Sequence, residues 1–416
     1  MAQRVVITGT GVVTPLGFDN QQILSALKSG QTNFERSDVD PDCVVCPVKN
    51  FNLLDYAGKF KNRRYLNSGA SFSVAAALMA LNDAHLNKDS LTNAGLFIGA
   101  GPNLDIEKEF TDISNGKAKW SNIQALWLLK FLPNTAASII TQLTGIHGEC
   151  ATLGTACAAS LQAIGNAYHN IKDGYINVAV TGGGDSRLSK GGLMGYKKAH
   201  AIYCGDGIPE ETCRPFDQNR DGFVPGEGAA FFVLESLAHA TNRGATIIAE
   251  IIGFGASMDG YQMAAPHPDG IYARMAIEKA LHEANINIHE IDLIAAHGTG
   301  THLNDIMEAK MIKKLFVSKN PRIIAIKSWI GHLAAACGAA ELAICLACMQ
   351  NNYIPEIRNL IQPCHQLLNF VKTPEKVSFN TLLLENFGFG GQNCAIIVSK
   401  LSDQSANGAY PMDGAK

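Results

Sequence analysis

The residues best suited to chemistry are one cysteine in a run of small side chains and two histidines far along the chain. Cys157 lies in the segment Gly154–Ser160, of sequence GTACAAS. A short buried strand is expected before it at 149–153, and residues 161–168 carry apolar side chains at helical spacing. Unpaired N–H groups at a helix start stabilise a nucleophilic thiolate. The alternative is a buried structural cysteine, the usual role of an isolated Cys.

Both histidines follow an apolar segment that predicts a strand. His297 comes after the expected strand 291–295, and His332 comes after the expected strand 322–326. Functional sites collect at the carboxyl ends of strands in open α/β sheets. Either His alone is more commonly structural, but together with Cys157 they form a set suited to thiol chemistry.

Four charged residues lie close to these histidines in the sequence. Lys327 follows apolar neighbours that predict its burial, and Glu341 lies in the apolar helix expected at 333–349. A buried carboxylate needs a partner, and Lys327 is a candidate for Glu341. Asp305 and Glu308 share one face of the next helix after His297. They either support the site or act as ordinary acids near a helix start.

A glycine-rich turn is expected at 386–393, near the end of the chain. The glycines around Phe389, among them Gly388, allow backbone N–H groups to approach a reacting oxygen. Together with the N–H of Cys157 they would form an oxyanion hole. Phe389 stands between glycines and could move as a gate.

Composition sets the class of protein. The chain has 416 residues, 47% hydrophobic and 17% charged, with a net charge of −3. These values favour a compact enzyme and imply no nucleic-acid or membrane-surface partner. No apolar run has membrane-spanning length, and the first residues predict a strand and not a signal peptide. The eleven scattered cysteines favour reduced thiols and a cytoplasmic protein.

No metal or cofactor is expected. Cys43 and Cys46, like Cys345 and Cys348, have metal-like spacing, but neither pair has a second pair nearby. The turn at 9–14 resembles a dinucleotide-binding loop, but Thr14 stands where the third Gly is required. We interpret these glycines as packing positions.

The order of predicted elements divides the chain into two similar halves, 1–250 and 251–400, followed by a mobile tail at 401–416. Alternating strands and helices predict mostly parallel sheets covered by helices, with the last two strands near 376–384 and 393–399. An apolar insert at 101–134, which contains Trp120 and Trp127, is expected to form a pocket wall or a subunit contact.

A basic cluster precedes the long helix expected at 66–86. It is either a solvated helix start or a docking patch for an acidic partner. Its residues are Lys59, Lys61, Arg63 and Arg64.

Four motifs together resemble the β-ketoacyl-ACP synthases, most of all the elongating synthase II type and its relatives in type II polyketide synthesis. The similarity extends over about residues 3–400, and jointly the motifs are highly specific. They are TACAAS at 155–160, HGTGT at 297–301, KSWIGH at 327–332 and NFGFGG at 386–391.

The resemblance implies a thiolase fold, with two similar halves in five αβαβα layers, assembled as a dimer. It implies that Cys157 takes an acyl chain from an acyl carrier protein (ACP) and that malonyl-ACP then loses CO2 and attacks the acyl thioester. His297 and His332 would stabilise the malonyl enolate. Further implied roles are pantetheine binding by Thr299 and Thr301, a supporting pair of Lys327 and Glu341, gating by Phe389 and carrier docking near 59–64.

The chain departs from the usual motifs at several positions. The common NSFGFGGTN is ENFGFGGQN at 385–393, Trp329-Ile330 replaces the common Met-Thr, and LAAACG at 333–338 replaces LxGAAG. These changes bear on pocket shape, and they favour a specialised polyketide or aryl-polyene pathway over housekeeping fatty acid elongation.

Three other functions share parts of this sequence pattern. A non-catalytic chain-length-factor-like subunit would lack the nucleophile, which this chain has. A thiolase would need a second Cys as base, and Cys394 is poorly placed for that role. A catalytic subunit that is active only with a separate partner stays open, so the partner is either a second copy in a homodimer or a chain-length-factor-like subunit in a heterodimer.

Overall fold

The computed structural model describes residues 2–104, 113–114, 117–118 and 125–401. Ten strands form one continuous mixed sheet, in the order β12-β11-β13-β14-β10-β1-β9-β8-β4-β7. The strands of this sheet are β1 (Val5–Val13), β4 (Gly95–Gly99), β7 (Cys150–Leu153), β8 (Val178–Ser186), β9 (Glu227–Ser236), β10 (Ala249–Met258), β11 (Leu293–Ala295), β12 (Arg322–Ile324), β13 (Thr381–Gly388) and β14 (Gln392–Ser399). Two small hairpins pair β2 (Glu35–Arg36) with β3 (Val44–Val45) and β5 (Ile113–Ser114) with β6 (Lys117–Ala118).

The helices alternate with these strands. The α-helices are α1 (Asn20–Ser29), α2 (Leu54–Ala57), α3 (Ser68–Asp83), α5 (Thr135–Thr144), α6 (Ala159–Lys172), α7 (Lys190–Lys198), α8 (Pro209–Thr212), α9 (Leu237–Asn242), α10 (Ile271–Ala284), α11 (His302–Leu315), α12 (Lys327–Ile330) and α13 (Cys337–Gln350). The 3-10 turns are η1 (Lys61–Tyr65), η2 (Lys88–Ser90), η4 (Trp127–Lys130), η5 (Ala156–Ala158), η6 (Ile288–Glu290) and η7 (Ala334–Ala336). None of the helices in the described ranges is long and apolar enough to cross a membrane.

The sheet is built from two five-stranded halves with the same topology. From the junction between β1 and β10 outward, the strand orders are β1-β9-β8-β4-β7 and β10-β14-β13-β11-β12. In each half these are the first, fifth, fourth, second and third strands in chain order. The repetition that the element order predicted is therefore present in the strand connections.

The first strand of each half packs against the following helix in the same way. A Cβ atom at Gly11 would lie 2.0 Å from the carbonyl oxygen of Ala76 in α3. A Cβ atom at Gly255 would lie 2.0 Å from the carbonyl oxygen of Ala276 in α10. Glycine is therefore required where each helix meets its strand, which confirms these glycines as packing positions. The turn expected at 9–14 is wrong, since residues 9–13 belong to β1.

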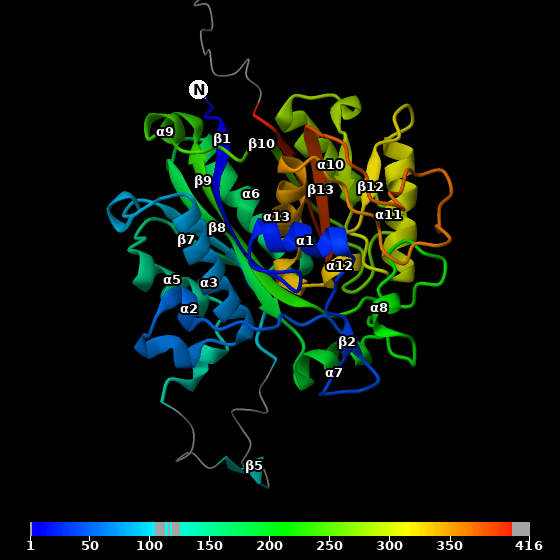
Figure 1. Ribbon diagram of the computed structural model, residues 1–416, viewed down its shortest axis with the longest axis horizontal. Helices are drawn as coiled ribbons and strands as arrows, with labels where there is room; N and C mark the ends of the chain where they lie inside the picture. Colours follow the sequence, from blue (N-terminus) through cyan, green and yellow to red (C-terminus); the bar gives the residue numbers. More distant parts are fainter. Residues whose placement is uncertain (1, 105–112, 115–116, 119–124, 402–416) are drawn as a thin grey trace, which may run out of the picture.

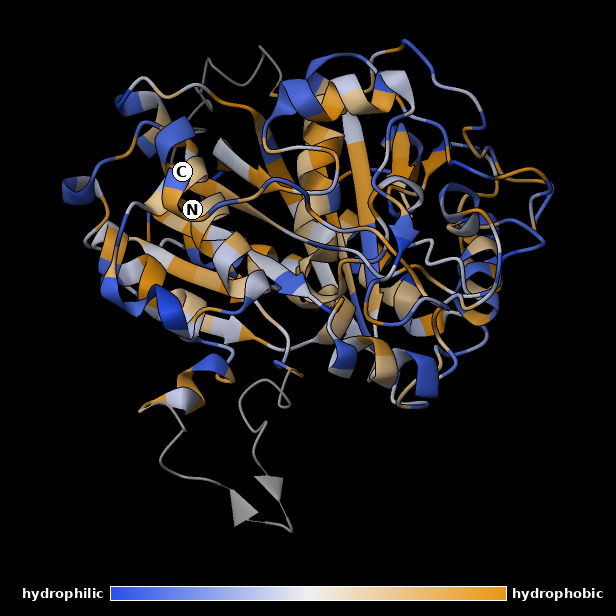
Figure 2. Ribbon diagram, turned by 60° about the horizontal axis from the view of Figure 1, so that its bottom comes forward, coloured by the Kyte–Doolittle hydropathy of each residue, from blue (hydrophilic) through white to orange (hydrophobic). Residues whose placement is uncertain are grey.

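The halves stack as five layers. The helices α6 and α13 lie side by side between the two halves, while α3 and α5 cover one outer face and α10 and α11 cover the other (Figure 1). Every residue of α13 from Cys337 to Met349 is buried, as expected for a helix covered on all sides. Apolar residues are concentrated in the central helices and strands, and polar residues in the outer loops (Figure 2). The five-layer αβαβα architecture is thus the fold of this chain.

Two details of the predicted strands are wrong. The large sheet is not mostly parallel, since five of its neighbouring pairs are antiparallel and four are parallel. The reason is that the last strand of each half, β9 or β14, inserts antiparallel between the first and fourth strands. The strand expected at 376–384 is β13 (Thr381–Gly388), which extends into the glycine-rich motif. Trp120 and the tail beyond 401 lie outside the described residues.

Candidate active site

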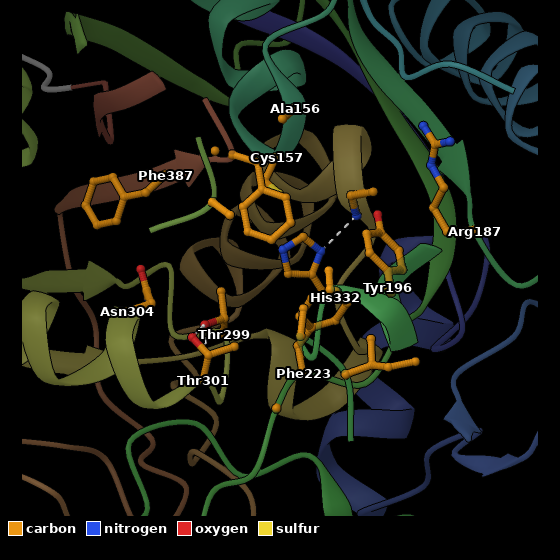
Figure 3. Close-up of a pocket in the computed structure, with 18 of the residues that line it drawn as sticks. Ala156, Cys157, Arg187, Tyr196, Phe223, Thr299, Thr301, Asn304, His332 and Phe387 are labelled. Atoms are coloured by element: carbon orange, nitrogen blue, oxygen red, sulfur yellow. Dashed lines mark hydrogen bonds between the residues drawn. The ribbon is translucent and has the colours of Figure 1, made fainter. Parts of the chain in front are cut away.

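Cys157, His297, His332 and Phe389 line one cavity of about 1010 Å³. Each side chain follows the carboxyl end of a strand, namely β7, β11, β12 and β13. Figure 3 shows Cys157 and His332 facing this space, with Thr299 and Thr301 together on another side. The topology therefore brings together residues that are up to 232 positions apart because both halves direct their strand ends toward the junction between them.

The thiol of Cys157 lies at the start of the central helix α6. Cys157 is in the 3-10 turn η5, and the preceding Ala156 has a positive φ of 48°. Burial raises the pKa of the Cys157 thiol to about 11, while the charge of Lys327 and the backbone N–H groups of Phe389 and Cys157 lower it. The prediction that the helix start yields a stabilised thiolate is wrong for the resting site because desolvation outweighs these donors.

The two N–H groups next to the Cys157 sulfur come from the turn between β13 and β14 and from the nucleophile itself. A Cβ atom at Gly388 would lie 2.8 Å from the carbonyl oxygen of Thr155 and 3.2 Å from the Cys157 nitrogen. The absence of a side chain at 388 lets the turn approach the nucleophile this closely. Two N–H donors converging beside a nucleophile can stabilise the oxyanion of a tetrahedral intermediate.

His297 presents a defined tautomer to the cavity. Its Nδ1 atom lies 3.1 Å from Lys327 Nζ and 3.3 Å from Asn386 Nδ2, and both of these atoms are donors. Nδ1 is therefore the acceptor, and the proton resides on Nε2. Burial, together with the charge of Lys327, lowers the pKa of His297 well below its usual range. The ring is thus neutral and offers one N–H to the cavity.

His332 is also neutral with its proton on Nε2, but a backbone N–H fixes its tautomer. Its Nδ1 accepts a hydrogen bond from the Ala334 N–H at 3.0 Å, so Nε2 again carries the proton. Burial lowers the pKa of His332 to about 3. Its ring packs on Phe223 with 4.6 Å between centroids and lies 5.8 Å from the ring of His297. Two neutral imidazoles with Nε2–H groups can together hold an oxygen that gains negative charge.

A buried ion pair stands behind His297. Lys327 Nζ lies 2.5 Å from Glu341 Oε1 and donates to the carbonyl oxygen of His297 at 2.7 Å. Both side chains are 1% exposed. Burial opposes the charge on Lys327, but the Glu341 carboxylate outweighs it and raises the pKa of Lys327.

The two acids on the helix after His297 are fully buried and hold the loop that carries it. Glu308 accepts the N–H groups of His297 and Gly298 at 2.6 and 2.9 Å. Asp305 accepts the N–H groups of Thr299 and Gly300 at 3.1 to 3.2 Å. They hold this loop in place rather than serving as solvated acids near a helix start.

Thr299 and Thr301 lie on the cavity wall. Their hydroxyl oxygens are 2.9 Å apart, and both residues face the cavity. A pair of adjacent hydroxyl groups at the rim of a deep cavity suits the binding of an extended polar chain.

The structure adds residues that the sequence did not single out. Asp185 and Arg187 form a buried ion pair of 3.0 Å on the cavity wall, and Asp185 also accepts the N–H of Ala335 at 3.2 Å. Tyr196 also lines the cavity and packs edge-to-face on Phe223 at 5.0 Å. Asp185 ends a stretch at 177–185 that predicts a strand, and Tyr196 lies in a segment that predicts loops but forms α7, so neither position carried a signal for chemistry.

Some expected contributors do not line the cavity. Trp329 is fully buried, its indole N–H donates to the carbonyl oxygen of Glu356 at 2.8 Å, and it lies outside the cavity lining. The expectation that Trp329-Ile330 bears on pocket shape is therefore wrong for direct contact. The four basic residues at 59–64 are exposed on and beside η1, away from the cavity lining, as either a docking patch or a solvated helix start requires. In the described ranges, no group of three or more His, Cys, Asp or Glu side chains is arranged to hold a metal.

Comparison with known proteins identifies relatives of this chain. Protein-family models match at residues 2–240 (Beta-ketoacyl synthase, N-terminal domain) and 248–361 (Beta-ketoacyl synthase, C-terminal domain). The 3-oxoacyl-[acyl-carrier-protein] synthase 2 of Vibrio harveyi is 32% identical over 96% of this chain and 99% of its own. A crystal structure of a β-ketoacyl synthase from Burkholderia phymatum has a TM-score of 0.89 and 30% identity over 96% of this chain and all of its own. The ishigamide ketosynthase/chain length factor has a TM-score of 0.87 and 28% identity over 97% of this chain and all of its own.

Proposed function

The chain belongs to the β-ketoacyl synthase family, and on that premise we propose that it condenses an acyl group held on Cys157 with malonyl-ACP to give β-ketoacyl-ACP. The observation that carries this proposal is the joint presence on one cavity of Cys157 and two neutral imidazoles with Nε2–H donors. A non-catalytic chain-length-factor-like subunit would not need a nucleophilic cysteine together with two histidine donors.

In the first half-reaction, the Cys157 sulfur attacks the thioester carbonyl of acyl-ACP. The carbonyl oxygen gains negative charge and is held by the N–H groups of Cys157 and Phe389. The carbonyl–sulfur bond to the carrier then breaks, the carrier thiol leaves with the proton lost by Cys157, and the acyl group stays on Cys157.

In the second half-reaction, malonyl-ACP binds with its thioester oxygen at the two Nε2–H groups. The bond between the carboxylate carbon and C2 breaks, CO2 leaves, and the electron pair forms an enolate whose oxygen His297 and His332 stabilise. C2 then attacks the acyl carbonyl on Cys157, the carbon–sulfur bond to Cys157 breaks, and the departing Cys157 thiolate takes up one proton from water to restore the thiol. The products are β-ketoacyl-ACP and the free enzyme.

The chain has residues suited to bind the carrier protein and its pantetheine arm. Thr299 and Thr301, with hydroxyl groups 2.9 Å apart on the cavity wall, would hold the pantetheine arm. Phe389 is 42% exposed at the cavity, in a turn with positive φ at Gly390 and Gly391, which suits a movable gate. The exposed basic residues at 59–64 suit docking of an acidic carrier protein.

We place the enzyme in a specialised polyketide or related pathway rather than in housekeeping elongation. The support is the polar wall beside Cys157, formed by Asp185, Arg187 and Tyr196, which suits an oxygen-bearing acyl chain better than a plain alkyl chain. The working unit would be a dimer in the cytoplasm, either of two copies or with a chain-length-factor-like subunit.

Mass spectrometry of Cys157 after incubation with acyl-ACPs tests the proposal. We expect a thioester on Cys157, with oxygenated chains loaded faster than alkyl chains of equal length. Cys157→Ala is expected to abolish condensation while the protein still folds, and Cys157→Gln is expected to retain malonyl decarboxylation because both histidines remain. Condensation by the Ala variant would disprove the assigned nucleophile, and faster loading of alkyl chains would disprove the pathway assignment.

A further inference from the structure

Glu385 is a second fully buried carboxyl group behind the histidine loop, and the reaction proposed above does not use it. It is 0% exposed in β13, and no donor among the described residues is hydrogen-bonded to either of its carboxyl oxygens. An ionised carboxylate with no donor in a dry interior is strongly unfavourable.

The strand geometry places Glu385 against the helix that holds His297. Leu383 and Phe387, two residues before and after it, belong to the outer core formed with α10 and α11. Side chains alternate across a strand, so Glu385 faces this same outer layer. Glu308 is also fully buried on α11, next to Met307 and Ala309 of this same cluster, and the two carboxyl groups interact.

Glu308 already has the donors that an ionised carboxylate requires. Its Oε1 and Oε2 accept the N–H groups of His297 and Gly298, and Asn304 Nδ2 donates to Oε2 at 3.0 Å. Glu385 has none of these donors. Burial raises the pKa of both carboxyl groups, to about 7 for Glu308 but further for Glu385, because Glu308 has N–H donors that stabilise its charged form.

We propose that Glu385 is a positioning residue that remains protonated and donates its carboxyl hydrogen to Glu308, so that Glu308 holds the backbone of His297 and Gly298 in its working position. The inference rests on the proposed function, since it assigns a residue that orients an imidazole of that site. Glu385 itself does not line the cavity and touches no substrate.

The other charged groups of the surrounding elements are balanced by partners of their own. Asp305 of α11 faces Arg220 at 3.7 Å, and Lys327 of α12 is paired with Glu341 of α13. The neighbouring positions on the flanking strands, Ala296 after β11 and Ala395 in β14, carry no charge. Glu308 is the charged group that acts on Glu385, and its proximity together with burial raises the pKa of Glu385 well above its usual range.

Infrared spectroscopy of the full chain tests the proton directly, independently of activity. We expect the C=O band of a buried carboxylic acid near neutral pH in the wild type, and we expect this band to be lost in Glu385→Gln. Glu250→Gln is the matched control, since Glu250 is a buried carboxyl paired with Arg4 at 2.6 Å, and it should leave the band unchanged. If the Glu385→Gln spectrum shows no loss of the band, the proposal is overturned.

Kinetics tests the positioning role. Glu385→Leu removes the donor and should lower kcat for malonyl-ACP decarboxylation about tenfold with little change in KM. Glu385→Gln keeps a neutral donor, so its kcat should be close to that of the wild type. Because an amide does not lose its proton, the decline of kcat at alkaline pH should also move to higher pH in this variant. Equal loss in the Gln and Leu variants would overturn the role.

Two further outcomes separate the possible failures. An absent acid band together with activity that depends on added K+ or Na+ would mean that a cation neutralises two ionised carboxylates, and the proposal would fall. A wild-type enzyme that shows the band but neither decarboxylates nor condenses would disprove the proposed function while leaving the protonated Glu385 in place.

Discussion

Lys327 Nζ lies 3.1 Å from His297 Nδ1 and 2.5 Å from Glu341 Oε1, so one buried cation both sets the tautomer of the histidine and neutralises a buried carboxylate. The ammonium group cannot accept a hydrogen bond, so it fixes Nδ1 as the acceptor. The ring proton of His297 is thereby directed to Nε2, and no carboxylate of the described residues is hydrogen-bonded to the ring. A neutral imidazole, rather than a charged one, is then what meets the substrate.

Lys327→Met should lower both stability and activity. It leaves Glu341 as an uncompensated buried charge, which costs about 3–5 kcal/mol of unfolding free energy. The double variant Lys327→Met/Glu341→Gln removes both charges and should regain part of that stability, but not the activity. Urea unfolding of the three proteins measures this. A double variant no more stable than the single one would show that the pair is not the source of the loss.

His297→Ala and His332→Ala should separate the two half-reactions. Each variant removes one donor to the malonyl enolate, so decarboxylation should fall by about 10²–10³. The oxyanion donors near Cys157 remain, so transfer of an acyl group to Cys157 should persist. Release of CO2 from malonyl-ACP and the mass of acylated Cys157 are the two measurements. Normal decarboxylation in either variant would remove that histidine from its assigned role.

Gly388→Ala should impair catalysis with little change in the free energy of unfolding. The new Cβ would lie 2.8 Å from the Thr155 oxygen, so the turn that carries Phe389 must move away from the nucleophile. Loss of one oxyanion donor typically lowers kcat by about 10²–10³. The control is Gly195→Ala in α7, where a Cβ meets nothing within 4 Å. Comparable rates for the two variants in acyl transfer to Cys157 would contradict the assigned oxyanion hole.

The positions of the chemically capable residues could be predicted from sequence because each follows a short apolar strand. The positions of Cys157, His297 and His332 at strand ends, and the two similar halves, depend on local patterns and element order. The antiparallel insertion of β9 and β14 was not predictable, since buried strands look alike whatever their direction.

The balance between burial and nearby donors at the site could not be predicted from the sequence either. A helix start favours a thiolate, but burial of Cys157 in the assembled cavity raises its pKa, and only the structure shows which effect is larger. Likewise, Trp329 is a conspicuous residue in its motif, yet its side chain lies in the core and not in the cavity. Burial is a property of the packed chain, and it decided both cases.

Acid should destabilise the fold partly through His332. Its pKa is about 3 in the folded protein, below the ordinary value of 6.5, so the unfolded chain binds a proton that the folded chain lacks between these values. The unfolding free energy therefore falls as pH drops below 6.5, by about 2 kcal/mol between pH 7.5 and pH 5. Gln cannot titrate, so the unfolding free energy of His332→Gln should fall by about 2 kcal/mol less than that of the wild type over the same pH range. Equal acid sensitivity of the two proteins in urea unfolding would argue against a buried neutral His332.

Alkylation of Cys157 should report its raised pKa. With a thiol pKa of about 11, the thiolate fraction rises about tenfold per pH unit, so the rate with iodoacetamide should climb from neutral pH to beyond pH 10 without a plateau near 9. Lys327→Met removes a nearby positive charge that lowers this pKa, so it should slow alkylation at every pH in that range. Fragmentation of the alkylated peptide in the mass spectrometer distinguishes Cys157 from the exposed Cys150. A plateau below pH 9 would mean that the donors around the sulfur outweigh its burial.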